Sequence, residues 1–468
     1  MIAKTFSAAV NGIEADIVEV EVYISSGNPS ITIVGLPDMA VKESKDRFTA
    51  AIKNSGFDFP YSKKVVVNLA PADLKKEGGA FDLPLALAIL AAIGRIKKDK
   101  LSEFCIIGEL SLEGKIRGGR GSLPIALGMQ KNHIKKLIVP FANRQESAIV
   151  KNIEVFPFKT LSEAASFING DLVLEPFVYN PINSQDSFFN CEYDFSDVKG
   201  QQSAKRAVEI AAAGSHNVIM SGPPGAGKTM LAKRIPSILP PMTFEESIQT
   251  TTIHSAAGQN FSGGLIVQRP FRNPHHTSSA VALAGGGVYP KPGEVSLAHN
   301  GVLFLDEFAE FRRDALEILR QPLEDRRITV SRAKSTISFP ASFMLVAAMN
   351  PCPCGNFGSR DKECVCSAGQ IVRYKNKISG PLLDRIDIHI EVPALKVNEL
   401  ANWTHNAESS QSIRQRIIEA RLIQNIRFKS SKMFSNAQMG VKDIKKYCVL
   451  DAQAAQVLRL AIEKLKFS

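Results

Sequence analysis

The sequence predicts an α/β protein in which a domain built on a parallel sheet follows a smaller mixed domain and precedes a helical segment. Three observations predict this arrangement. The chain has 468 residues, which is too many for one ordinary core. Residues 217–229 (NVIMSGPPGAGKT) put a glycine-rich loop between a strand-like run and a helix-like run. Beyond that loop, short apolar runs alternate with helical patterns, which is typical of a parallel sheet covered by helices.

The first part of the chain, residues 1–168, is expected to form an α/β or α+β domain of its own. Its predicted strands are Ser30–Val34, Lys64–Leu69 and Lys136–Pro140, and its predicted helices are Val41–Ser55, Leu83–Ala92 and Leu161–Ile168. Residues 169–192 contain Asn-Pro and Asn-Ser pairs and few periodic apolar positions. This composition is typical of a linker.

The second domain is expected to span residues 193–395. In chain order its predicted elements are a helix at Gln201–Ala213, a strand, the glycine-rich loop, a helix, a Gly- and His-rich stretch at His254–Gly293, a strand at Val302–Leu305, a helix at Asp314–Arg320, a hairpin across Ile328–Phe339 and a strand at Ser342–Ala348. After Pro393 the pattern becomes helical and basic. Residues 396–468 are therefore expected to form a small α-helical lid.

Composition and charge narrow the class of protein. The hydrophobic content of 44% fits a globular protein, and no apolar run approaches the length of about 18 residues that a membrane span needs. The N-terminus lacks the apolar segment of a secretory signal, so we expect a cytoplasmic protein with no membrane partner. The net charge is +11, and residues 411–468 carry twelve Lys or Arg against four Asp or Glu. The excess favours nucleic acid or another polyanion as partner, and the alternative is a solvated helical face.

The glycine-rich loop has the spacing G-x-x-x-x-G-K-[ST] of a phosphate-binding loop. Its glycines allow backbone N–H groups to point at phosphate oxygens, and the following helix adds the positive end of its dipole. Lys228 would reach the β- and γ-phosphates of a nucleoside triphosphate, and Thr229 would hold magnesium. The predicted nucleotide-binding residues are Gly222, Pro223, Pro224, Gly225, Ala226, Gly227, Lys228 and Thr229.

Two carboxylates, Asp306 and Glu307, follow the apolar run at Val302–Leu305. In an open parallel sheet, ligands lie at the carboxyl ends of the strands. Asp306 is therefore predicted to hold the magnesium ion with Thr229, and Glu307 is predicted to polarise the attacking water. The alternative is a strand that ends in solvated acids.

Two further polar residues are predicted to take part in catalysis. Asn350 follows a very apolar strand, where its amide could hold the same water or touch the γ-phosphate; alone, it would be a turn former. Arg385 lies between Asp384 and Asp387. It is either a partner in a local ion pair or an arginine finger that completes the site of a neighbouring subunit, because a guanidinium suits the charge on a transferring phosphoryl group.

Four of the seven cysteines form two C-x-C pairs, Cys352 with Cys354 and Cys364 with Cys366. Nine residues separate the pairs, which allows a zinc site with four thiolate ligands. The pairs are tighter than the usual C-x-x-C spacing. A loop without metal is therefore the alternative.

With these elements in this order, the chain resembles the AAA+ ATPases, and specifically the magnesium-chelatase-like branch that contains the YifB/ComM family. The resemblance extends over essentially the whole chain. Its most specific segments are RPFRNPHH (269–276), GEVSLAH (293–299), GVLFLDEF (301–308), NPCPCG (350–355) and LLDRI (382–386). It implies ATP and magnesium as cofactors, Asn350 as first sensor, Arg385 as a finger acting in trans, and a hexameric ring.

The resemblance also implies a fold for the two ends of the chain. Residues 1–168 look like the proteolytic domain of Lon, but the stretch that corresponds to the nucleophile motif is Lys76-Glu-Gly-Gly-Ala80, which has no hydroxyl at the nucleophile position. Peptidase activity is therefore not expected. Family members continue past Ser468 into a helix that carries a second-sensor arginine. The partial lid is accordingly expected to be truncated, which puts full hydrolytic competence in doubt.

For the activity, the resemblance implies an ATP-dependent motor on branched or single-stranded DNA, with branch migration or helicase action in recombination or natural transformation. The hairpin across Ile328–Phe339, with Arg332 and Lys334, resembles one that helicase-like relatives project into the ring channel, where its cations could contact phosphates; the alternative is a surface hairpin with charged edges. Two other functions remain open. One is a chelatase- or chaperone-like motor that remodels a protein partner, and the other is an inactive remnant that binds ATP.

Overall fold

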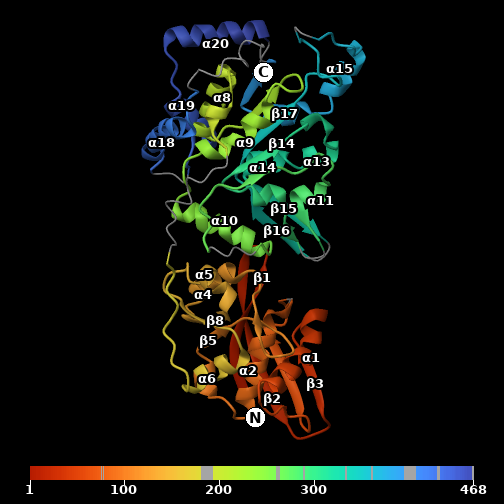
Figure 1. Ribbon diagram of the computed structural model, residues 1–468, viewed down its shortest axis with the longest axis vertical. Helices are drawn as coiled ribbons and strands as arrows, with labels where there is room; N and C mark the ends of the chain where they lie inside the picture. The colour runs from red at the N-terminus through yellow and green to blue at the C-terminus, as the bar shows by residue number, and fades with distance from the viewer. Residues whose placement is uncertain are drawn as a thin grey trace.

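The computed structural model describes residues 1–74, 76, 78–180, 193–259, 264–287, 290–332, 335–359, 362–394, 407–429 and 433–465. Part of the expected linker (181–192), the boundary at residues 395–406, the hairpin residue Lys334 and the last residues, 466–468, lie outside this description. The molecule is elongated, with a mixed sheet in its lower half and a parallel sheet in its upper half in Figure 1.

The mixed sheet has seven strands in the order β3-β4-β2-β1-β5-β8-β9. These are β1 (Ile2–Asn11), β2 (Glu14–Ser25), β3 (Ser30–Val34), β4 (Lys64–Ala70), β5 (Phe104–Ile106), β8 (Lys136–Pro140) and β9 (Glu154–Phe158). Strand β2 is antiparallel to β1 and β4, and the other pairs are parallel. Several helices pack on this sheet: α1 (Met39–Asn54), α2 (Asp82–Ala92), α3 (Lys98–Leu101), α4 (Ser122–Lys131), α5 (Arg144–Ser147) and α6 (Leu161–Asn169). The same part of the chain contains the short strands β6 (Glu109–Leu110) and β7 (Ile116–Arg117) and the single turns η1 (Gly79–Phe81) and η2 (Phe141–Asn143).

Helix α2 forms the centre of the first core. All eleven of its residues are buried, because its sequence DLPLALAILAA is apolar on every side. The buried carboxylate of Asp82 is compensated by Arg47 on α1, whose Nε lies 2.7 Å from Asp82 Oδ2. Burial raises the pKa of Asp82, and the Arg47 guanidinium opposes that rise.

The second sheet has five strands, all parallel, in the order β11-β14-β17-β10-β18. They are β10 (Val218–Ser221), β11 (Phe271–Arg272), β14 (Val302–Leu305), β17 (Met344–Met349) and β18 (Ile388–Glu391). Strands β10, β14 and β17 are apolar and almost fully buried, as central strands covered on both faces must be. The prediction of a mixed α/β protein with a parallel sheet is therefore confirmed.

Helices surround this second sheet. They are α8 (Gln202–Gly214), α9 (Lys228–Ile238), α10 (Phe244–Ala256), α11 (Ala280–Ala284), α12 (Glu294–Leu297), α13 (Arg313–Glu317), α14 (Arg320–Asp325), α15 (Ala368–Lys375) and α16 (Gly380–Leu383), with single turns η3 (Phe195–Asp197) and η4 (Phe308–Glu310). Two antiparallel hairpins are added, β12 (Gly285–Gly286) with β13 (Lys291–Pro292) and β15 (Arg327–Arg332) with β16 (Ser335–Pro340). In the second hairpin Ile328 pairs with Phe339, so the predicted hairpin is confirmed.

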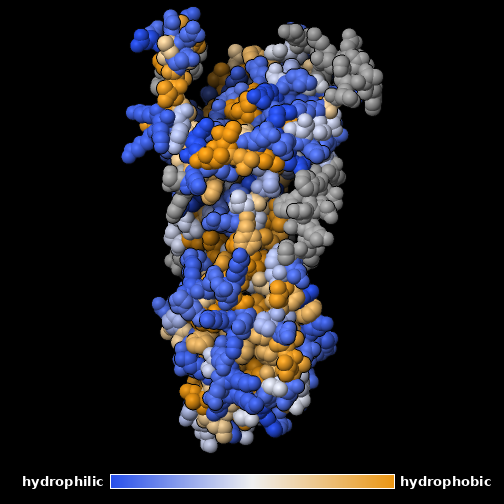
Figure 2. All heavy atoms as spheres, turned by 90° about the vertical axis from the view of Figure 1, so that its left-hand side faces the viewer, coloured by the Kyte–Doolittle hydropathy of each residue, from blue (hydrophilic) through white to orange (hydrophobic). Residues whose placement is uncertain are grey.

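The C-terminal segment is helical, with α18 (Ser410–Arg427), η5 (Asn436–Gln438), α19 (Val441–Tyr447) and α20 (Ala452–Leu465). Helix α18 packs on α8 and α9, whereas α20 lies at the far end of the molecule in Figure 1. Figure 2 looks at the face that carries α18, where hydrophobic residues interrupt a hydrophilic surface. Leu422, Ile423 and Ile426 of α18 are among the exposed apolar side chains.

The two sheets meet through α4, α10 and the end of the β1–β2 hairpin. The Gly121 amide donates to Ser255 Oγ at 3.1 Å. Gly12 in the β1–β2 turn has φ +66, and a Cβ there would lie 2.6 Å from Ile337 of β16, so the turn approaches the β15–β16 hairpin closely. Among the described helices, none is both long enough and apolar enough to cross a bilayer.

Candidate nucleotide-binding site

The predicted phosphate loop, residues 222–227, joins the central strand β10 to helix α9. Gly222 follows β10 and lies against the residue that follows β18, because a Cβ there would lie 2.1 Å from Val392 O. Gly227, just before α9, has φ +88, a backbone conformation that favours glycine. The loop therefore leaves the carboxyl end of β10 and turns directly into the N-terminus of a helix, which is the geometry for binding phosphate.

Lys228 is the first residue of α9, and its side chain folds back over the loop. Its Nζ donates to Gly222 O at 2.6 Å, Pro223 O at 2.9 Å and Asn350 Oδ1 at 3.2 Å. Burial lowers the pKa of this ammonium, and the nearby Asp306 carboxylate opposes the shift. The ammonium is thus held at the mouth of the loop by neutral oxygens, which a phosphate oxygen could replace. Asn350, 122 residues further along, is brought into the same cluster.

Thr229 and Asp306 form the predicted magnesium pair. Thr229 Oγ1 donates to Asp306 Oδ2 at 2.7 Å, which joins the start of α9 to the end of β14. The other carboxylate oxygen, Oδ1, accepts from the Glu307 amide at 2.9 Å. A hydroxyl and a carboxylate at a phosphate loop are oxygen ligands that Mg²⁺ prefers, so these residues fit the ion.

Glu307 lies beside this cluster and is held by a residue that the sequence did not single out for catalysis. Its Oε2 is 2.8 Å from Nδ1 of His276. His276 follows β11, the strand that pairs with β14, so the two side chains come from neighbouring strand ends. Glu307 has φ +52, a left-handed conformation, so the backbone changes direction at this residue as it leaves β14. The pairing of β11 with β14 could have indicated this contact. Strand β11 has only two residues, however, so the sequence shows no periodicity from which the strand could be predicted.

Gln201 is a second residue that the sequence reasoning missed. It precedes α8 with φ +54, and its Nε2 donates to Ala226 O at 3.2 Å and to Pro393 O at 2.7 Å. It therefore ties the phosphate loop to the end of the parallel sheet. No local motif marks such a residue.

Arg385 is not brought to the phosphate loop. It precedes β18, at the amino end of the sheet, whereas the loop lies at the carboxyl end. Its guanidinium donates to Glu324 and, at 2.6 Å, to Pro381 O. The local ion pair that the sequence left open is thus formed, but with Glu324 rather than with Asp384 or Asp387.

The four predicted zinc ligands converge in the loop after β17. The Sγ atoms of Cys352, Cys354, Cys364 and Cys366 all lie within 4.8 Å of one another, and this is the one such group found among the described residues. Three of their separations are 3.4, 3.6 and 3.7 Å. A tetrahedron of sulfurs about 2.3 Å from zinc has edges of about 3.8 Å, so the thiols fit this ion.

The cysteine loop touches the phosphate loop. Gly355, with φ +82, leaves no room for a side chain, because a Cβ there would lie 2.5 Å from Pro224 Cδ. The thiol cluster and the nucleotide-binding loop therefore form one packed unit.

Comparisons with known proteins identify the family of the chain. The family model described as magnesium chelatase, subunit ChlI, matches residues 194–400, that of subunit ChlI of Mg-chelatase matches residues 20–143, and the ChlI C-terminal model matches residues 407–468. The competence protein ComM of Haemophilus influenzae is 44% identical over 470 residues, covering 100% of this chain and 90% of the relative. The protein YifB of Escherichia coli is 42% identical over 450 residues, covering 96% and 87%.

A more distant similarity covers less of the chain. Lon protease 2 of Bacillus subtilis is 27% identical over 146 residues, which are 30% of this chain and 26% of that protein. The full-length matches are the ones that decide the family. Because these matches cover almost the whole chain, it belongs to the ComM/YifB family of magnesium-chelatase-like AAA+ ATPases.

Proposed function

We propose that this protein is an ATP-driven motor that acts on branched or single-stranded DNA. The proposed nucleotide chemistry rests on one observation. Lys228 donates a hydrogen bond to Asn350 and Thr229 donates one to Asp306, so side chains from the ends of three separate strands meet. In this proposal Gly222–Thr229 hold ATP, and Thr229 and Asp306 hold magnesium. The bound ion would neutralise charge on the phosphates.

Glu307 is the general base of the proposed reaction. Its carboxylate would take the proton of the attacking water, and the Asn350 amide would hold the same water or the γ-phosphate. Arg385 would reach the nucleotide of a neighbouring copy in a ring, because in its own chain it lies at the other end of the sheet. A hexamer is the ring that the family resemblance implies.

DNA is the partner that the charge and the hairpin favour. The chain has a net charge of +11. Strands β15 and β16 pair over their full described length, and the sequence of this hairpin contains Arg332 and Lys334. The similar protein of Haemophilus influenzae is named a competence protein. Together these features support a polyanionic nucleic acid more than a protein partner.

The test is an ATPase assay with and without forked DNA. We expect forked DNA to raise the rate of hydrolysis in the unmodified protein, and Lys228→Ala to abolish hydrolysis. Lys233→Ala, an exposed position on the same helix, is the matched control and should retain activity. A rate that no form of DNA changes would favour a chelatase- or chaperone-like motor on a protein. ATP binding without turnover would favour an inactive remnant.

We also propose that the four-cysteine cluster binds zinc and that residues 1–168 form a Lon-like scaffold without peptidase activity. The sulfur separations of 3.4–3.7 Å support the first. Ala80 supports the second, because it offers no hydroxyl where a nucleophile would stand. Cleavage of a fluorogenic peptide that Ala80 variants abolish would refute the scaffold role. The helical segment after residue 396 would serve as the partial lid.

A further inference from the structure

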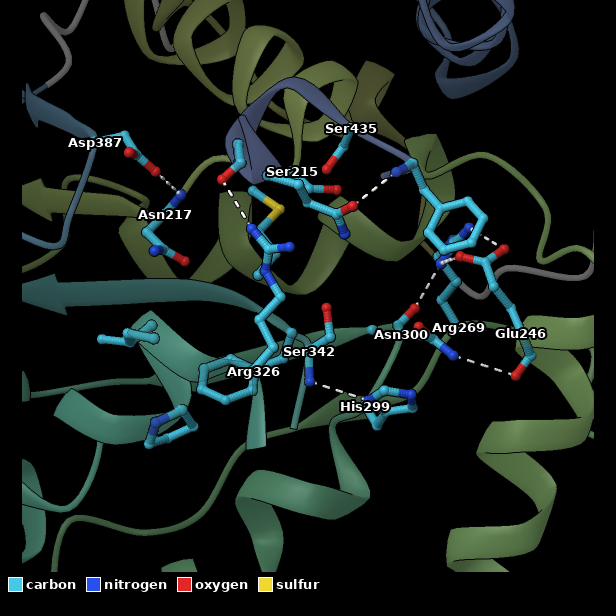
Figure 3. A pocket seen from close by; sticks show the side chains of 18 of the residues that line it. Ser215, Asn217, Glu246, Arg269, His299, Asn300, Arg326, Ser342, Asp387 and Ser435 are labelled. Carbon is cyan, nitrogen blue, oxygen red and sulfur yellow. Dashed lines mark hydrogen bonds and ion pairs between the residues drawn. The ribbon is translucent and has the colours of Figure 1, made fainter. Parts of the chain in front are cut away.

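A cavity of about 790 Å³ lies at the amino ends of the parallel strands, at the edge opposite to the phosphate loop. Residues at or just before the starts of β10, β14, β17 and β18 line it, and Figure 3 labels Asn217, Ser342 and Asp387 among them. Five arginines line it against four carboxylates. Because it faces away from the phosphate loop, it cannot hold the nucleotide bound by the same chain.

Two of these arginines are already neutralised. Arg269 forms two hydrogen bonds with Glu246, from Nη1 to Oε1 and from Nη2 to Oε2, both at 3.1 Å. Figure 3 shows this pair at the right of the cavity. Arg385 is paired with Glu324. These side chains are held in place, and their charges are compensated.

Arg421 on α18 has no carboxylate partner among the described residues. It donates to Phe434 O at 3.0 Å, to Ala212 O at 3.2 Å and to Ser215 Oγ, which are all neutral acceptors. Its Nε is enclosed and has no acceptor within the described structure. Burial lowers the pKa of Arg421 to about 10, so the side chain is still charged at neutral pH. The Glu246 carboxylate opposes this shift without bonding to Arg421 directly. A largely enclosed positive charge that is bonded only to neutral acceptors is costly unless an anion joins it.

Arg326 also has no carboxylate partner among the described residues. It has φ +56, a left-handed conformation that favours glycine and is found at ligand clamps. Its guanidinium rises into the cavity in Figure 3, where Nη2 donates to Ala437 O at 3.1 Å. Burial lowers its pKa. Arg326 therefore places a positive charge in the cavity although its backbone conformation is unfavourable for a residue other than glycine.

One short segment connects the two guanidiniums, because Arg421 contacts Phe434 and Arg326 contacts Ala437. Between them stands Ser435, which is 1% exposed and whose hydroxyl has no hydrogen-bond partner in the described structure. A ligand that accepted from Ser435 and from both arginines would satisfy all three. Tetrahedral oxyanions offer several strong acceptors and match the guanidinium fork.

We propose that this cavity binds a phosphate group between Arg326 and Arg421, with Ser435 as a further donor. Two sources have this chemistry: a free phosphate compound, or the terminal phosphate of a nucleotide held by a second copy of the chain. Binding of a free phosphate compound does not depend on the proposed ATP site, because the cavity lies at the other edge of the sheet. Binding of a neighbouring nucleotide rests on that proposed site.

The test uses the full chain with Lys228→Ala, so that the phosphate loop does not contribute, and inorganic pyrophosphate as the probe in a calorimetric titration. Adding Arg326→Gly or Arg421→Gln should weaken binding roughly tenfold or more, which is the scale of one charged hydrogen bond. Arg95→Gln, which removes a surface arginine of the first domain, is the control and should change nothing. Arg326→Gly should also keep or raise the melting temperature, because glycine suits φ +56. Lost binding would then not reflect unfolding.

A second titration separates the two sources. ATP is added to the protein with an intact phosphate loop, with and without Arg326→Gly. A lower ATP affinity that appears only at protein concentrations where copies associate supports the neighbouring nucleotide. An unchanged ATP affinity with weakened pyrophosphate binding supports a free phosphate compound. If pyrophosphate does not bind, or binds equally well to every variant, the proposal is overturned, whatever the ATPase assay shows.

Discussion

His276 Nδ1 lies 2.8 Å from Glu307 Oε2, so an imidazole from the end of one strand holds the proposed catalytic base at the end of the next. The ring of His276 is itself fixed, with its centroid 4.2 Å from that of His275 and its edge against Phe311. In the sequence the two residues lie in separate segments, 269–276 and 301–308. The contact occupies one oxygen of the Glu307 carboxylate, so His276 restrains the proposed base.

Releasing this contact should raise basal ATP hydrolysis. A partly exposed ion pair contributes about 0.5–1 kcal/mol, so His276→Ala is expected to increase the basal rate roughly two- to fivefold. The affinity for ATP should not change, because the interactions of His276 within the described structure are with Glu307, His275 and Phe311 and not with the phosphate loop. Steady-state kinetics without DNA give both values. His389→Ala on the edge strand β18, whose ring contacts Ile386 O instead, is the control; a lower rate in His276→Ala would contradict the assignment.

Glu307→Gln should separate binding from turnover. The amide keeps the size of the side chain but cannot accept a proton, so kcat is expected to fall by about 10²–10⁴-fold with ATP binding retained. Single-turnover hydrolysis and a binding titration measure the two effects. Glu310→Gln, three residues further and paired with Lys377 at 2.9 Å, is the comparison. Equal losses in both variants would argue against Glu307 as the base.

Removing one thiol should release zinc and also weaken the nucleotide site. Cys364→Ser is expected to lose the metal, measured by elemental analysis of protein purified without chelators, and to melt at a lower temperature. Because Gly355 of the same loop packs on Pro224, ATP binding should weaken as well. Cys448→Ser, at an exposed position outside the cluster, should do neither. Less than a tenth of a zinc per chain in the unmodified protein would exclude the site.

Stability should fall on mild acidification because of His299. Burial lowers the pKa of His299 to about 4, since the charged ring would lose its water. Its Nδ1 accepts from the Ser342 amide at 3.0 Å, which requires the neutral ring. The unfolded chain binds the proton first, so this stabilisation is present above pH 6.5 and is lost as the pH falls towards 4.

Between pH 7 and pH 5, the loss from His299 alone should be about 2 kcal/mol in the free energy of unfolding. Urea unfolding at the two pH values measures it. In His299→Asn this part of the pH dependence should disappear, although the variant will be less stable at pH 7. An unchanged difference between the two pH values would contradict the prediction.

Local pattern was enough for most elements of the fold. The predicted strands Ser30–Val34, Lys136–Pro140 and Val302–Leu305 coincide with β3, β8 and β14, because each is a short run of apolar and β-branched residues. Strands β1 and β2, the longest pair, were not predicted. In β1 the buried Thr5 donates to Leu101 O and Phe104 O, so a polar residue occupies a core position and the alternation of apolar and polar residues is blurred.

The helix expected at Asp314–Arg320 also differs from the structure, which has two short helices, α13 and α14, with a break at Ile318–Leu319. Both residues of the break pack into the second core, Leu319 fully buried and Ile318 partly buried. Packing against that core decides where the helix stops, and propensity alone does not carry this information.

By itself, the sequence determined the phosphate loop, the acidic strand end and the two cysteine pairs, because each of them depends on spacing within a few residues. Tertiary structure alone decided that Asn350 meets Lys228, that His276 holds Glu307, and that Arg385 lies at the opposite edge of the sheet. Tertiary structure also decided that Arg326 and Arg421 line one cavity. Strand order in the parallel sheet sets these distances, and it is fixed by long-range packing between segments whose separation in sequence exceeds any local pattern.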